Sequence, residues 1–157
     1  MRQKRLHGIA VTLLCAAAIF LSLWPGRAAA QEVDSAAASA IVMEAQNGTV
    51  LLSHDAETER PMASTTKIMT ALLALENGRQ DELVTASERA FGVPGTSIYL
   101  SAGETLTLHD MLYGLMLASG NDAAVAIAEH IGGTVEEFCV RMTARARELG
   151  CMHTVFL

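Results

Sequence analysis

Ser64 and Lys67 form a Ser-x-x-Lys pair at the start of a segment predicted to be helical. At this spacing two side chains share one helical face, so the lysine amine can reach the serine hydroxyl. An uncharged lysine can accept the hydroxyl proton while the serine oxygen attacks a carbonyl carbon. Burial and the positive end of the helix dipole both disfavour the ammonium form, so we expect Lys67 to face a dry core. The structural alternative is that Ser64 caps the helix and Lys67 is a solvated charge.

A second candidate is the run Ser119-Gly120-Asn121, between two predicted helices. Its serine hydroxyl can relay a proton, and its asparagine amide can bind an amide of a substrate. Here too a structural alternative exists, because Gly120 can end one helix while Asn121 or Asp122 caps the next. The pattern alone does not separate the two interpretations.

The elements around the serine pair can be placed from turn signals. Residues 40–45 and 49–53 are β-like runs on either side of Asn47-Gly48, which predicts a hairpin because both residues accept positive φ. Residues 31–39 are small and polar, typical of a flexible lead-in. Residues 64–75 predict a helix that is apolar nearly all round and therefore central in the fold, ending at Asn77-Gly78.

Three more helices are predicted after an irregular stretch. Residues 79–106 show little periodicity, with one short strand or turn near residues 97–100. A helix begins at Thr107, where Asp110 completes a capping box, and a second runs from residue 121 to Gly132-Gly133. The last helix begins at Thr134, again with an acid three residues later, and ends at Gly150.

The amino terminus is typical of a secretory signal. Residues 1–30 combine a basic start, an apolar run and three alanines before Gln31, so we expect cleavage and export. A retained membrane anchor is the alternative, but Pro25-Gly26-Arg27 cuts the run short of the roughly 20 residues that a span needs. Lipidation at Cys15 is a minor alternative, because no small residue precedes that cysteine.

Charge and cysteine content exclude several partners. The net charge is −6. Residues 1–30 contain four basic residues and no acidic one, so the remainder of the chain is more acidic still and would repel a nucleic-acid phosphate backbone. Cys139 and Cys151 are separated by about 18 Å if one helix joins them, which is too far for a disulfide. With His130 and His153 they match no zinc-ligand spacing, so we expect no metal and no cofactor.

The order and surroundings of the two motifs resemble a known family. Residues 61–72, followed by 119–124, closely resemble the serine D-alanyl-D-alanine carboxypeptidases, the low-molecular-weight penicillin-binding proteins. The resemblance covers nearly all of residues 40–157 and includes four further segments: 45–52, 103–107, 112–115 and 148–152. It implies an α/β (α+β) fold of the β-lactamase/transpeptidase-like type. We expect this chain to hold the N-terminal β-hairpin and the helical part, with the C-terminal sheet strands missing.

The resemblance also implies roles for the candidate residues. Ser64 is acylated by the penultimate D-Ala of a peptidoglycan stem peptide, and water then releases the shortened peptide. Lys67 is the base, Ser119 hydrogen-bonds the lysine and delivers a proton to the leaving amine, and Asn121 holds the substrate amide. β-Lactam antibiotics acylate the same serine as covalent inhibitors. The expected location is extracytoplasmic: the cell wall, the periplasm or the outer face of the cytoplasmic membrane, with membrane attachment only through an anchor absent from this chain.

The chain departs from the family pattern in one important respect. The family has a third motif, Lys-Thr-Gly, that binds the substrate carboxylate beside an oxyanion donor, whereas the only lysines here are Lys4 and Lys67. A lesser departure is Thr143, where the family usually has Asn. We therefore expect residues 31–157 to be the N-terminal portion of the catalytic domain, weak or inactive as given. The alternatives are a serine β-lactamase-like hydrolase and a non-catalytic cell-wall-binding remnant. Gly120 favours the carboxypeptidases over the β-lactamases.

Overall fold

A computed structural model of the chain describes residues 31–32 and 36–157, which divide into two units with the boundary after Thr58. The predicted signal peptide, residues 1–30, lies outside the described residues. Across the residues that are described, every helix is too short or too polar to span a bilayer.

The first unit contains a three-stranded sheet in the order β1-β3-β2. Strands β2 (Ala40–Met43) and β3 (Val50–His54) are antiparallel, which confirms the predicted hairpin. Its connection is longer than a two-residue turn, and only Gly48 of the Asn-Gly pair has positive φ, at 72°. Asn47 instead accepts the N–H of Thr49 through its side chain, at 2.8 Å. The hairpin is thus formed by side-chain capping rather than by two left-handed residues.

The prediction of a flexible lead-in over residues 31–39 is wrong at its first two residues. Strand β1 (Gln31–Glu32) pairs in parallel with Leu52 and Ser53 of β3. The free edge of β3 offers backbone donors and acceptors to any extended segment, whatever its side chains. A polar composition therefore does not exclude pairing.

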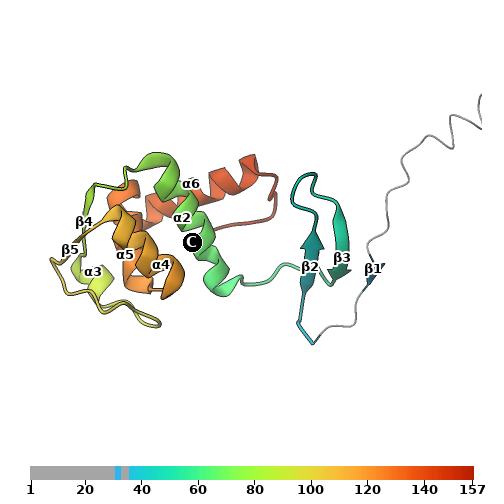
Figure 1. The fold of residues 1–157 in the computed structure, drawn as a ribbon, viewed down its shortest axis with the longest axis horizontal. Coiled ribbons are helices and arrows are strands. Elements are labelled where there is room, and N and C mark those ends of the chain that lie inside the picture. The colour runs from blue at the N-terminus through green and yellow to red at the C-terminus, as the bar shows by residue number, and fades with distance from the viewer. Residues whose placement is uncertain (1–30, 33–35) are drawn as a thin grey trace, which may run out of the picture. The chain divides into compact units, whose positions relative to one another are not determined.

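The second unit is mainly helical (Figure 1). Its elements are a single 3₁₀ turn η1 (Ala63–Thr65), α2 (Thr66–Asn77), β4 (Leu83–Thr85), α3 (Glu88–Phe91), β5 (Thr105–Thr107), α4 (Leu108–Leu117), α5 (Asn121–Gly132) and α6 (Val135–Glu148). Helix α5 is central, because it packs against α2, α3, α4, α6 and β4. In Figure 1, β4, β5 and α3 gather at one end of the four longer helices.

The predicted helices are confirmed, together with their capping residues. The hydroxyl of Thr107 accepts the N–H of Asp110 at 3.1 Å, and that of Thr134 accepts the N–H of Glu137 at the same distance. Each of these bonds satisfies a backbone donor that has no partner inside the helix. Gly133, with φ of 85°, follows the end of α5 as expected.

The prediction for residues 79–106 is wrong in its detail. Strands β4 and β5 pair in antiparallel fashion with Leu83 opposite Thr107, and α3 lies between them in the sequence. The expected short strand or turn near residues 97–100 is irregular chain instead. Strands of three residues leave almost no periodic signal, and their pairing joins segments more than twenty residues apart, so local pattern does not reveal them.

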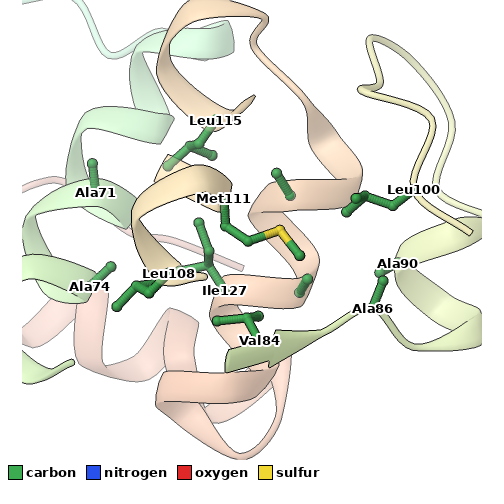
Figure 2. Packing of buried hydrophobic residues seen from close by; sticks show 12 residues of the cluster. Ala71, Ala74, Val84, Ala86, Ala90, Leu100, Leu108, Met111, Leu115 and Ile127 are labelled. Atoms are coloured by element: carbon green, nitrogen blue, oxygen red, sulfur yellow. The ribbon is translucent and has the colours of Figure 1, made fainter. Parts of the chain in front are cut away.

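Two apolar clusters hold this unit together. In the larger, Val84 of β4, Leu108 and Met111 of α4, and Ile127 of α5 are fully buried and converge on one another (Figure 2). Each large side chain buried in this way contributes about 1.5–3 kcal/mol. The smaller cluster joins α2, α5 and α6 through four buried residues: Leu73, Ala128, Phe138 and Met142.

Helix α2 is less enclosed than its composition predicts. Thr70, Ala71, Leu73 and Ala74 are buried, but Ile68 and Leu75 are 59% and 54% exposed. The prediction that every face of this helix is covered is therefore wrong for the described residues. Its partners α4, α5 and α6 contact the helix without surrounding it.

Candidate active site

Ser64 lies in the 3₁₀ turn that leads into α2, one turn ahead of regular helix. Its side chain is exposed. The residue before it, Ala63, has φ of 48°, in the left-handed region that costs a non-glycine residue roughly 1–2 kcal/mol. Such backbone strain is concentrated at functional sites, where it fixes the direction of a reactive side chain.

Ser119 faces Ser64 from the turn between α4 and α5. It too has positive φ, at 56°. Its hydroxyl donates a hydrogen bond to the Ser64 Oγ, with 3.2 Å between the two oxygens. The resemblance implied a bond from Ser119 to the lysine, whereas in the structure this hydroxyl bonds to Ser64 itself.

Lys67 projects from the first turn of α2 and is half-buried. The expectation that it faces a dry core is wrong for the described residues: its ammonium donates a hydrogen bond of 2.7 Å to the Oδ1 of Asn121. This bond joins residues 54 apart in sequence, so the packing of α2 against α5 helps to place the ammonium. Lys67 is oriented by a neutral amide rather than by an opposite charge.

Asn121, the first residue of α5, connects the lysine to the segment before the 97–100 loop. Its Oδ1 accepts from Lys67, while its Nδ2 donates to the carbonyl of Pro94 at 2.8 Å. Its backbone N–H donates to the carbonyl of Thr96 at 2.7 Å. The partners on both sides fix which end of the amide is oxygen. Each end of the amide also retains one further hydrogen-bonding position.

The four predicted site residues therefore gather around Ser64, which lies between two hollows. One hollow of about 460 Å³ is lined by Ser64, Lys67, Thr70, Val93, Asn121 and Val125. The other, of about 300 Å³, is lined by Ser64, Lys67, Ile68, Met116 and Ser119. Hollows of this size suit a short peptide or a comparable small molecule.

Asp122 is a component of this region that the sequence suggested only as a helix cap. Its side chain is 1% exposed. Burial alone would raise the pKa of Asp122, but its hydrogen bonds outweigh burial and hold this pKa below its usual value. The donors are the Ser97 hydroxyl and the backbone N–H groups of Ile98, Leu100 and Ala123. The sequence signal that could have indicated this role is the position of Asp122 directly before the apolar stretch of α5.

Comparison with known proteins places this chain in a family. The peptidase family described as D-alanyl-D-alanine carboxypeptidase matches residues 26–157. The chain belongs to that family. It is 42% identical over 130 residues to the D-alanyl-D-alanine carboxypeptidase DacF of Bacillus subtilis, an alignment that covers 80% of this chain and 33% of that protein. The chain thus spans about a third of that relative's length.

Solved structures of the family share the fold. The D-alanyl-D-alanine carboxypeptidase DacD of Francisella tularensis superposes with a TM-score of 0.75 at 29% identity, over 82% of this chain and 32% of that one. The D-alanyl-D-alanine carboxypeptidase of Mycobacterium tuberculosis gives 0.73 at 31% identity, over 80% and 47%. These matches confirm the resemblance and the mixed α/β fold class predicted from the two motifs.

The two cysteines among the described residues line neither of the hollows beside Ser64. Cys139 and Cys151 are both free, which confirms that no bridge joins them. Burial raises the pKa of the Cys139 thiol, and its side chain packs against the smaller apolar cluster. In the part of the chain that the structure describes, no three His, Cys, Asp or Glu side chains lie close enough to bind a metal ion.

Proposed function

We propose that the protein is a serine-type D-Ala-D-Ala carboxypeptidase, which removes the terminal D-Ala from peptidoglycan stem peptides through an acyl-enzyme on Ser64. The single observation that carries this proposal is the arrangement of four polar side chains from two segments, residues 64–67 and 119–121. Ser119 Oγ lies 3.2 Å from Ser64 Oγ, and Asn121 holds the Lys67 ammonium 2.7 Å away. Membership of the family supports the same assignment.

Acylation begins with attack by Ser64 Oγ on the carbonyl carbon of the penultimate D-Ala. Lys67, in its uncharged form, accepts the serine proton. The bond from this carbon to the nitrogen of the terminal D-Ala then breaks, and the proton is delivered to that nitrogen through the Ser119 hydroxyl. Ser119 suits this relay because its oxygen already contacts the Ser64 oxygen. The products are free D-Ala and an ester on Ser64.

Deacylation follows the same steps with water as the nucleophile. Lys67 accepts a proton from the water as its oxygen attacks the ester carbon, and Ser64 regains a proton when it leaves. The remaining donor and acceptor positions on the Asn121 side chain hold the backbone amide of the peptide during both steps. A β-lactam reacts as the peptide does, because its ring amide occupies the place of the D-Ala-D-Ala bond.

The same proposal covers partners and location. The partner is the D-Ala-D-Ala end of the stem peptide, and β-lactams are covalent inhibitors. The site is extracytoplasmic, and export depends on residues 1–30. The 17 acidic residues against 11 basic ones oppose binding to nucleic acid. Residues 31–157 carry no Lys-Thr-Gly motif, so we propose that they react slowly by themselves.

Labelling with a fluorescent penicillin tests the assignment. The full-length gene product should be labelled, and Ser64→Ala should abolish labelling, whereas the matched control Ser101→Ala should label normally because it removes a hydroxyl from an exposed loop. Mass spectrometry should place the adduct on Ser64. An adduct on any other side chain contradicts the proposal.

Product analysis separates the alternatives. Release of D-Ala from a peptide ending in D-Ala-D-Ala, with slow turnover of the chromogenic cephalosporin nitrocefin, is the result expected of a carboxypeptidase. Fast nitrocefin turnover without D-Ala release would indicate a β-lactamase-like hydrolase. Peptide binding in titration calorimetry with neither reaction would indicate a cell-wall-binding remnant.

A further inference from the structure

We propose that Asp122 is a positioning residue, whose buried carboxylate fastens residues 97–100 to the start of α5 and thereby fixes Asn121 at the cleft. The inference rests on the proposed function, because it assigns Asp122 to the acylation of Ser64. Asp122 touches none of the reacting atoms, so it acts through its neighbours.

The carboxylate of Asp122 gathers a segment that lies more than twenty residues earlier in the sequence. It accepts the Ser97 hydroxyl at 2.6 Å, the Leu100 N–H at 3.0 Å and the Ile98 N–H at 3.1 Å. The Ala123 N–H donates to its other oxygen at 2.9 Å. One buried side chain thus supplies acceptors for four donors, three of them from a loop without regular hydrogen bonding.

The same loop contacts the cleft through Asn121. The carbonyls of Pro94 and Thr96 accept the side-chain and backbone N–H groups of Asn121. The segment 94–100 is therefore tied to α5 at two adjacent residues, one of which also orients Lys67. Loss of the hydrogen bonds to Asp122 would therefore loosen residues 94–100 as a whole. The Pro94 carbonyl would then no longer hold the Asn121 amide that orients Lys67.

Packing leaves this segment little freedom to adjust. A Cβ at Gly114 would lie 2.6 Å from the Cδ1 of Ile98, and one at Gly120 would lie 2.8 Å from the Oδ1 of Asp122. Both glycines make room for the loop at positions that a larger residue would block. The close approach shows that the carboxylate and Ile98 occupy a fitted site.

Only an ionised carboxylate can satisfy these donors. An asparagine of the same shape has one acceptor oxygen and an NH₂ group that would face backbone N–H groups. Asp122→Asn therefore leaves donors without acceptors in a buried place, and the loop must move to find water. The substitution changes hydrogen bonding and leaves volume nearly unchanged, which makes it the informative variant.

The test measures the acylation rate of the full-length gene product with a fluorescent penicillin. We expect Asp122→Asn to slow acylation at least tenfold, and the exposed Asp110→Asn to leave it unchanged as the matched control. Asn121→Leu should also slow acylation. Because Asp122 acts through Asn121, the double variant should be about as slow as the slower single variant.

Two results would overturn the inference. One is a folded Asp122→Asn protein that acylates at the wild-type rate, and the other is a double variant whose loss is the product of the two single losses. If Asp122 had a purely structural role, its effect on the acylation rate would be independent of Asn121, and the two single losses would multiply in the double variant. If Asp122→Asn does not fold, Ser97→Ala replaces it. We expect this variant to slow acylation threefold to tenfold, and its combination with Asn121→Leu to be about as slow as the slower single variant. An unchanged acylation rate in Ser97→Ala overturns the inference. A wild-type protein that is never labelled would instead refute the proposed function.

Discussion

Asn121→Leu tests how the cleft residues are held, because it keeps the approximate shape of the side chain and removes both of its polar ends. In the structure these ends receive the Lys67 ammonium at 2.7 Å and bind the Pro94 carbonyl at 2.8 Å. Without them the ammonium loses its acceptor, and residues 94–100 lose one of their attachments to α5. The reactive amine is then free to leave the neighbourhood of Ser64.

The expected size of the effect follows from the two bonds. A hydrogen bond to a charged group contributes about 1.5–3 kcal/mol, and the lower value applies here because Lys67 is only half-buried. The neutral bond to Pro94 contributes about 1 kcal/mol. If both are needed in the transition state, the barrier rises by about 2.5 kcal/mol, which is roughly a 70-fold slower acylation.

The assay follows labelling by a fluorescent penicillin over time, at several concentrations, with thermal unfolding as a check of folding. The matched control is Asn77→Leu, which removes a side-chain amide bond of 2.8 Å to the Leu73 carbonyl at the far end of α2, the helix that carries Lys67. This control should acylate at the wild-type rate.

Two outcomes would refute the reasoning. A folded Asn121→Leu protein with the wild-type rate would show that the lysine does not depend on the amide. An equal slowing in Asn77→Leu would show that general destabilisation of α2 explains the loss.

Further predictions concern packing, pH and capping. Gly120→Ala should lower the free energy of unfolding by about 1–3 kcal/mol, because the new Cβ would lie 2.8 Å from the Asp122 carboxylate, while Gly92→Ala, with 3.4 Å to its nearest neighbour, should have little effect in urea unfolding. Hydrogen bonds hold the pKa of Asp122 below its usual value, so its ionised form stabilises the fold at neutral pH, and this stabilisation is lost as the pH falls through the usual value toward the lower folded-state value. The stability difference between wild type and Asp122→Asn should therefore shrink in that acid range, and a constant difference would refute the assignment. Thr134→Ala should cost about 1 kcal/mol in thermal unfolding through loss of the cap on α6, and Thr134→Ser, which keeps the hydroxyl, should restore most of it.

The local elements were predictable because their signals are local. Caps at Thr107 and Thr134 and terminating glycines after α5 and α6 place helix ends within a few residues. The hairpin over residues 40–54 was equally clear from its Asn-Gly turn. By contrast, β4 and β5 are three residues each, and their pairing depends on contacts that no window along the chain contains.

The candidate site was predictable in its membership and not in its contacts. The two motifs named Ser64, Lys67, Ser119 and Asn121, and all four line the two hollows on either side of Ser64. The partners differ from the expectation: Lys67 is held by Asn121 in a half-buried place, and Ser119 contacts Ser64. The hydrogen-bond partners of these side chains depend on how α2 packs against the turn before α5, and tertiary packing decides that arrangement.

The amino-acid sequence by itself determined the helix boundaries, the hairpin, the family and the four polar residues of the cleft, because each follows from residue types at short, fixed spacings. Only the tertiary structure decided that the buried Asp122 carboxylate holds a loop from more than twenty residues earlier in the sequence, and that Asn121 orients Lys67. The physical reason is that a buried charge and its donors can be separated by any length of chain. Their pairing is fixed by the packing that excludes water around them.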